Sequence, residues 1–176
     1  MTEANPLLVT IEANTDEVVC ETLVASGQIY SREILSEAMF HAAYRGRMRV
    51  VEKLLECGAD IDWVHGGDLG RTALLDAIEH NHFEVAKLLI KMGADIRAVD
   101  RWGSGALAIA ITAEWDAAQA KGDDVPDAMM TRLLIDHGAP VDVIVNGASI
   151  DEFARGLGHP AAADVIAAAR MRPGRP

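Results

Sequence analysis

A short phrase that recurs three times constrains the fold of this chain more than any other feature. It reads LLECGADID at 54–62, LLIKMGADIR at 88–97 and LLIDHGAPVD at 133–142. The spacings between its glycines are 35 and 45 residues for Gly58, Gly93 and Gly138. A period in the low thirties, lengthened once here, is typical of stacked helical hairpins, because each hairpin buries its apolar face only against a neighbouring copy.

A short alanine-rich stretch precedes each copy of the phrase, at 38–49, 73–84 and 106–113. Apolar residues recur there at three- and four-residue steps, which predicts helices. The phrase predicts a second helix that ends at its glycine, where a left-handed cap is least costly for a residue without a Cβ. Thr72 and Ser104 precede their helices, and we expect each to be an N-cap or a turn residue.

These stretches together resemble the ankyrin repeat family. The family pattern G-x-T-x-L-x-x-A followed by L-L-x-x-G-A-D is met by GRTALLDA (70–77) with LLIKMGAD (88–95), and nearly met in the neighbouring units. The resemblance implies an all-α fold, an ankyrin-repeat solenoid of about five stacked helix-turn-helix units with short β-hairpin-like loops. The turn-rich segments DLGRT (68–72) and DRWGS (100–104) would form two of these loops.

Fainter copies extend the repeat to both ends of the chain. Residues 6–29 align without gaps on 37–60, with Gly27 under Gly58, and 148–170 align His159 with His82. Terminal units of a solenoid face water on one side and are therefore atypical. We expect a single domain over 6–171, followed by a frayed tail at 172–176. The units are predicted at about 6–36, 37–69, 70–102, 103–146 and 147–171.

The loop DWVHGGDLG (62–70) is two residues longer than its counterpart in the next unit, so its tip is expected to protrude. An exposed Trp63 on this tip would indicate a contact with another molecule. The alternative is that Trp63 folds back on the solenoid.

The fourth unit carries an insertion near 114–126. The interval from Ala110 to Leu133 is 23 residues, against 11 from Ala77 to Leu88. We expect the first helix to be extended by about two turns and to end at Gly122. The acids predicted for this protruding element, some of which would cap the next helix, are Glu114, Asp116, Asp123, Asp124 and Asp127, against the single base Lys121. Two interpretations remain open: a contact element carrying Trp115, or a tolerated surface loop.

Charge and cysteine content exclude some classes of function. The chain has 27 acidic and 16 basic residues, a formal charge of −11. It is therefore a poor candidate for binding nucleic acid or an anionic membrane, and a better one for a basic partner, although solubility alone also explains the charge. Cys20 and Cys57 lack metal-ligand spacing and are predicted to be small buried hydrophobes. With no signal peptide and no bilayer-length apolar stretch, we expect a cytoplasmic protein.

No catalytic motif emerges from the sequence. The glycines of HGGDLGR are followed by neither Lys-Ser nor Lys-Thr, and G-x-S-x-G, C-x-x-C and H-E-x-x-H are absent. His80 and His82 are two residues apart, so on a helix they would point to different sides. The resemblance implies that His41, His82 and His159 are structural. We expect no enzyme activity, no cofactor and no metal.

The resemblance also implies where a partner would be contacted. The family's usual contact positions fall on Tyr44, Arg45, Val64, Asp68, Leu69, Arg71, Glu79, His80, Met92, Val99, Arg101, Trp102, Ser104, Thr112 and Ala113. Trp63 and Trp115 join them as candidates of their own. Trp, Tyr and Arg are enriched among binding hot spots.

We therefore expect a protein-interaction module that is monomeric when unbound and contacts its partner through the concave face and loop tips. Three uses remain open: an inhibitor or immunity-type protein that occupies a toxin or enzyme, a scaffold or regulatory subunit, and a self-assembling solenoid. The sequence does not name the partner, because a fold indicates only a mode of action.

Overall fold

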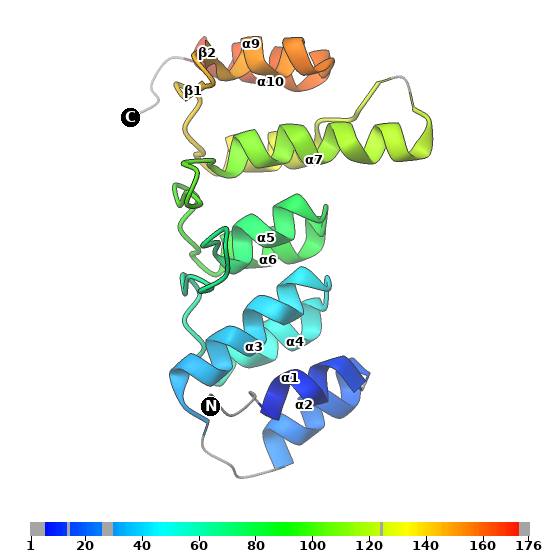
Figure 1. The fold of residues 1–176 in the computed structure, drawn as a ribbon, viewed down its shortest axis with the longest axis vertical. Helices are drawn as coiled ribbons and strands as arrows, with labels where there is room; N and C mark the ends of the chain where they lie inside the picture. Colours follow the sequence, from blue (N-terminus) through cyan, green and yellow to red (C-terminus); the bar gives the residue numbers. More distant parts are fainter. Residues whose placement is uncertain (1–5, 14, 26–29, 124, 173–176) are drawn as a thin grey trace.

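The structure is a computed structural model that describes residues 6–13, 15–25, 30–123 and 125–172. Over these residues the helices form five consecutive pairs, stacked along the long axis of the molecule with the loops between units on one side (Figure 1). Their bounds are α1 Pro6–Ala13, α2 Asp16–Ala25, α3 Arg32–Tyr44, α4 Met48–Glu56, α5 Ala73–Glu79, α6 Phe83–Lys91, α7 Ala106–Lys121, α8 Met129–Asp136, α9 Ile150–Leu157 and α10 Pro160–Arg170. The all-α solenoid expected from the sequence is confirmed.

The core follows the alanine-rich pattern of the first helix in each pair. Helices α1, α3, α5, α7 and α9 pack side by side along the stack, and each also packs on the second helix of its own pair. Ala38, Ala42, Ala73, Ala77 and Ala110 are fully buried. Small side chains let neighbouring helices approach closely, and aliphatic residues of the second helices fill the remaining space.

Glycines end the second helices as predicted. Gly58, Gly93 and Gly138 have φ values of 100°, 94° and 91°, the left-handed conformation that only glycine adopts at little cost. Thr72 is the N-cap of α5, its hydroxyl accepting from the N–H of Leu75 at 3.4 Å. Ser104 is a turn residue instead, because the N-cap of α7 is Gly105.

The loops between units form short hairpins. Antiparallel bridges join Val64 to Thr72 and Val99 to Gly105. The last hairpin pairs β1 (Ile144–Val145) with β2 (Ala148–Ser149), in the register Ile144 to Ser149 and Val145 to Ala148. Its turn, Asn146–Gly147, has positive φ at both residues, the combination that a type I′ hairpin turn requires.

The expected extension of the fourth unit is confirmed. Helix α7 has 16 residues against 7 in α5, and its far end projects beyond the stack in Figure 1. Gly122 ends it with φ of 76°. Asp127 then accepts from the N–H of Met129 at the start of α8, at 3.1 Å.

Hydrogen bonds from the α5–α6 turn tie three pairs together. His82 Nε2 lies 2.8 Å from the carbonyl oxygen of Tyr44, in the pair before it. The Asn81 amide donates to the carbonyl of Ala113, in the pair after it, at 2.8 Å. His82 is therefore a structural histidine, as the resemblance implied.

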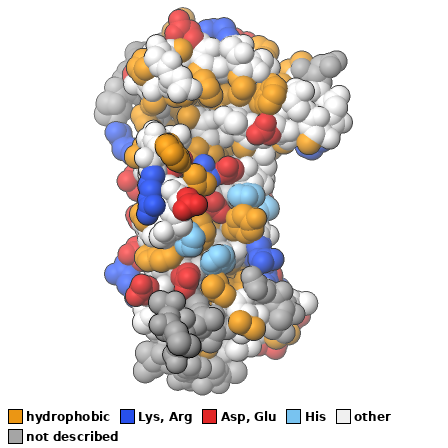
Figure 2. Space-filling view, viewed as in Figure 1, with side chains coloured by type: hydrophobic (Ala, Val, Ile, Leu, Met, Phe, Trp, Pro, Cys, Tyr) orange, Lys and Arg blue, Asp and Glu red, His pale blue; other side chains and the backbone are white. Residues whose placement is uncertain are grey.

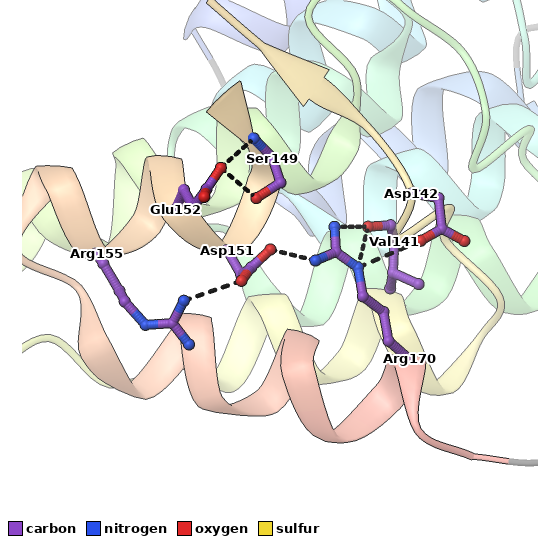
Figure 3. A network of polar contacts seen from close by, with 7 residues as sticks. All are labelled: Val141, Asp142, Ser149, Asp151, Glu152, Arg155 and Arg170. Carbon is purple, nitrogen blue, oxygen red and sulfur yellow. Dashed lines mark hydrogen bonds and ion pairs between the residues drawn. The ribbon is translucent and has the colours of Figure 1, made fainter. Parts of the chain in front are cut away.

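Ion pairs hold both ends of the stack. Arg47 pairs with Asp16 (2.6 Å) and donates to the carbonyl of Ile11, which joins the first two helix pairs. At the other end, Figure 3 shows Arg170 of α10 reaching the carbonyl of Val141 (2.8 Å) and the carboxylate of Asp151 on α9.

The expectations about the two cysteines and about one unit boundary need correction. Cys57 is exposed rather than buried, since it follows the last turn of α4. Cys20 is half-buried, and burial raises the pKa of its thiol. The predicted boundary between 6–36 and 37–69 falls inside α3, which begins at Arg32 because Ser31 caps it.

The remaining expectations concern the C-terminal tail, the membrane and residues outside the described ranges. Gly27, Asp124 and residues 173–176 lie outside the described residues. Within the tail predicted to be frayed, Arg172 lies 3.4 Å from Asp136 in an ion pair. Among the helices that the structure describes, none combines the length and apolar character needed to cross a membrane.

Candidate functional surface

The first helices and the hairpin loops together form one continuous face, on which two neighbouring hollows lie. We call it the concave face. In Figure 2, histidine and hydrophobic side chains gather over the middle of the molecule, at the level of α3 and α5, with acidic side chains beside them. Most of the predicted contact positions belong to this surface.

The central hollow, of about 380 Å³, lies between α3, α5 and the loop that precedes α5. Aromatic rings form its walls. His65 stacks on Phe40 with centroids 4.4 Å apart, and His41 meets His65 edge-on at 5.6 Å. The lining residues are Phe40, His41, Tyr44, His65, Gly67, Asp68, Leu69, Gly70, Arg71 and Asp76.

Asp76 is the buried carboxylate of this hollow. Only 6% of the residue is exposed, and Oδ2 has no hydrogen-bond partner in the structure. Burial raises the pKa of Asp76, and the nearby His80 and Arg71 offset this effect only in part. A buried carboxylate of this kind costs stability unless something else compensates it.

The second hollow, of about 250 Å³, continues the concave face towards the C-terminal end. It lies over α7 and reaches β1 and α9. Its lining residues are Arg71, Glu79, Ser104, Ala108, Ile109, Thr112, Ala113, Asp116, Val145, Asn146 and Phe153.

Arg71 lines both hollows and is held between two carboxylates. It pairs with Glu79 of α5 and lies 3.5 Å from Asp100 of the next hairpin. Asp100 also accepts the N–H groups of Trp102 and Ser104, both at 2.9 Å, which shapes the hairpin tip. Arg71 is therefore an internal link rather than a freely exposed contact.

Three exposed aliphatic residues follow the hairpins at the edge of the concave face. Val64, Val99 and Ile144 are 55%, 56% and 68% exposed, and each lies six residues after the glycine that ends the preceding helix. The repeat therefore places an apolar side chain at the same point of three successive hairpins. Trp102 lies three residues after Val99 in the sequence and, at 77% exposed, adds a large apolar surface.

The structure gathers some predicted contact residues and separates others. Those lining the two hollows are Tyr44, Asp68, Leu69, Arg71, Glu79, Ser104, Thr112 and Ala113. His80 meets the Tyr44 ring edge-on at 4.5 Å. Exposed positions outside both hollows are Arg45, Val64, Met92, Val99, Arg101 and Trp102. Ala113 is buried, so its side chain offers little to a partner.

Two of the tryptophans are half-buried, so they offer less surface to a partner than an exposed side chain would. Trp63 folds back on the solenoid, where it is half-buried against Phe40 and His65 at 6.4 and 5.9 Å between ring centroids. Trp115 is half-buried on α7 and lies against Gly158, at the end of α9.

Glu114, expected among the acids of the protruding element, is not a surface residue. It is buried and accepts the N–H groups of Met130 (2.6 Å) and Thr131 (3.0 Å) at the start of α8. The Thr131 hydroxyl and His159 Nε2 reach its other oxygen at 2.6 and 3.1 Å. Because His159 Nδ1 accepts from the N–H of Ala162, Nε2 carries the proton and donates to Glu114.

Sequence reasoning missed Asp76, Phe40 and His65 as lining residues. A recognisable pattern existed for Asp76, because its counterparts in the neighbouring helices are His41 and Ile109. A carboxylate at a buried register where neither counterpart is acidic indicates an unusual environment. His65 gave no such indication, because its place depends on how the longer loop folds.

Two further observations concern the described residues. A third hollow, of about 310 Å³, lies between the α5–α6 turn and the insertion. Among the described side chains, no group of three or more His, Cys, Asp or Glu is placed to hold a metal ion.

Comparisons with known proteins address the family. The model for ankyrin repeats (3 copies) matches residues 7–100 and 38–143. An ankyrin repeat protein of Rickettsia felis is 30% identical over 129 residues, which are 73% of this chain and 54% of that protein. An ankyrin repeat and KH domain-containing protein of Caenorhabditis briggsae is 34% identical over 74 residues, 42% of this chain.

The chain spans 3% of the length of the Caenorhabditis protein and about half of the Rickettsia protein. Among solved structures, an ankyrin repeat domain from Acinetobacter baumannii has a TM-score of 0.74 and 22% identity. The match covers 93% of this chain and 80% of that one. This similarity supports the fold.

Proposed function

The chain belongs to the ankyrin repeat family, and from this premise we propose that it binds a partner protein through its concave face and loop tips, without catalysis. Ankyrin repeats are generally protein–protein interaction modules. Their helices hold the fold through core positions, which leaves the surface residues of the stack free to suit a partner.

One observation carries the proposal: the two hollows of the concave face lie beside a row of exposed apolar side chains. Val64, Val99 and Ile144 recur at one register of the hairpins, and Trp102 is the most exposed of the large aromatic residues described. Contiguous apolar patches exposed to water are uncommon on monomeric proteins, and such patches mark binding sites.

The finer role that we propose is that of an inhibitor or immunity-type protein, acting in the cytoplasm on a basic partner and monomeric when unbound. The charge of −11 supports the choice of partner, because opposite charge accelerates encounter and disfavours acidic competitors. A scaffold or regulatory subunit is the alternative within the same mode of action.

Affinity capture from the native host's lysate tests the proposal. The bait is the wild-type chain beside Val99→Ser/Trp102→Ala, with Met171→Ser as the control, because Met171 is 82% exposed beyond the end of α10. We expect a stoichiometric protein partner that the double variant loses and the control keeps. No partner for a folded bait, or equal capture by all three, contradicts the proposal.

Activity measurements on the captured partner then separate the two roles. An inhibitor abolishes the partner's activity at a one-to-one ratio, whereas a scaffold leaves that activity intact. Sedimentation of the free chain gives the oligomeric state, and a concentration-dependent increase in mass would favour self-assembly instead.

A further inference from the structure

The central hollow combines aromatic walls with a buried carboxylate. Phe40, His41, Tyr44 and His65 surround a space of about 380 Å³, large enough for the end of one long side chain. The Tyr44 side chain stands at the rim, where 45% of the residue is exposed. Asp76 lines the same space from α5, more than nine-tenths buried.

The neighbours of Asp76 do not satisfy its carboxylate. His80 Nδ1 lies 2.9 Å from the backbone carbonyl oxygen of Asp76. Because a carbonyl oxygen only accepts, Nδ1 is protonated and donates its proton to this carbonyl. The same nitrogen is 3.9 Å from Asp76 Oδ2, beyond hydrogen-bond distance. Oδ2 therefore remains without a donor, which is rare for a buried oxygen and calls for an explanation.

The charge around the hollow is negative overall. Asp68 stands on the rim and Asp76 lies inside, while the one basic side chain that lines the hollow is Arg71. That guanidinium is already paired with two carboxylates, Glu79 and Asp100, although its Nε has no hydrogen-bond partner. An entering cation would thus meet a carboxylate with little water to screen it, beside electron-rich ring faces.

We infer that the central hollow receives the guanidinium of an arginine side chain from the partner protein, with Asp76 as its counter-charge and the aromatic rings as its stacking surface. A guanidinium is planar, stacks on aromatic rings and is more weakly hydrated than an ammonium group. An anionic group would be repelled by Asp76, and a purely apolar one would leave Oδ2 buried without a donor. This inference rests on the proposed function and names the anchor residue of the partner.

Titration with a blocked arginine, N-acetyl-arginine amide, tests the site directly by NMR. N-acetyl-citrulline amide is the matched probe, because a neutral urea replaces its guanidinium at nearly the same shape. The proteins are the wild-type chain, Asp76→Asn, and Asp116→Asn as the control, since exposed Asp116 lines the second hollow instead. The signals followed are the rings of Tyr44 and His65.

We expect saturable shifts of these ring signals with the arginine probe and none with the citrulline probe. The Asp76→Asn change should weaken the response about tenfold, the factor that corresponds to one lost charge-assisted contact, while Asp116→Asn leaves it unchanged. A citrulline response equal to the arginine response, or an unaltered response in Asp76→Asn, overturns the inference.

The two proposals fail in different ways. The probe titration needs no partner, so arginine binding without any captured partner would contradict the proposed function alone. A captured partner that binds Asp76→Asn as tightly as the wild-type chain would contradict this inference and leave the proposed function standing.

Discussion

Two aspartates of similar burial show how differently the C-terminal end and the middle of this solenoid treat a carboxylate. The side chains of Asp151 and Asp76 are 13% and 9% exposed. Burial alone would raise the pKa of Asp151, but its hydrogen bonds, which include those from the guanidinium groups of Arg155 and Arg170, outweigh burial and lower the pKa to about 2. At Asp76 burial prevails and the pKa is raised.

This difference in pKa distinguishes polar groups that stabilise the fold, at the C-terminal end, from Asp76, which does not stabilise it. At the C-terminal end every carboxylate drawn in Figure 3 has a partner, including Glu152, which accepts from the N–H and hydroxyl of Ser149 at 3.0 and 2.7 Å. An end unit has one neighbour instead of two, so polar contacts compensate for its smaller apolar interface. In the middle of the stack, by contrast, the buried Asp76 keeps one carboxylate oxygen without a hydrogen-bond donor.

The largest effect is expected from breaking the buried network at Glu114. The Glu114→Ala change removes the acceptor of two N–H groups of α8 and leaves His159 and Thr131 without their partner. Loss of one member of such a buried set lowers the free energy of unfolding by roughly 3–5 kcal/mol. Chemical denaturation measures this loss.

Asp116→Ala is the matched control for that experiment, because Asp116 lies two residues further along α7 and is exposed. We expect it to change stability by less than about 0.5 kcal/mol. Equal losses for the two variants would contradict the role given to Glu114.

A smaller loss is expected at the end cap itself. Arg170→Ala removes the donors to the Val141 carbonyl and the pair with Asp151, which join α10 to α9 and to the last hairpin. Because the Arg170 side chain is partly exposed, we expect a loss of about 1–2 kcal/mol. Hydrogen exchange should locate the loss in α9 and α10, and uniform loosening of all five pairs would count against a local cap.

Acid should weaken the C-terminal end selectively. The folded-state pKa of Asp151 is lowered to about 2, below the value near 4 of an unfolded chain, so its contribution is complete above that unfolded value and disappears as the pH falls towards 2. The stability difference between the wild-type chain and Asp151→Asn should therefore shrink from pH 6 to pH 2. A difference that is constant with pH would show that Asp151 acts by packing alone.

The smallest stability effect is expected at the most exposed aromatic residue. Trp102 is 77% exposed, so Trp102→Ala should change the free energy of unfolding by less than about 0.5 kcal/mol. Thermal unfolding checks this, and partner capture should fall in the same variant. A large loss of stability would mean that Trp102 supports the hairpin rather than a contact.

The sequence predicted those features that depend on local pattern. Gly58, Gly93 and Gly138 end their helices, and the interval between Ala110 and Leu133 predicted the longer α7. Such features follow from spacing and backbone preference, which a sequence states directly.

The sequence could not predict which way a side chain faces where two units meet. Glu114 was grouped with the other acids of the insertion as part of a protruding element, yet α7 passes the start of α8 there and turns this residue inward. The position of the Trp63 side chain was ambiguous for the same reason, since only the folded loop determines whether it faces water or packs against Phe40. Asp76 was predictable in principle, from its departure from the register of the other units.

The most direct test of this account is the same substitution at both aspartates, Asp76→Asn and Asp151→Asn, with the free energy of unfolding measured at pH 7. Asp151→Asn should lower it by about 2 kcal/mol, because charge-assisted hydrogen bonds are lost. Asp76→Asn should raise it, by up to about 1 kcal/mol, because a buried charge without a donor is removed. A loss of stability at both positions would contradict the claim that Asp76 is kept for binding at the expense of the fold.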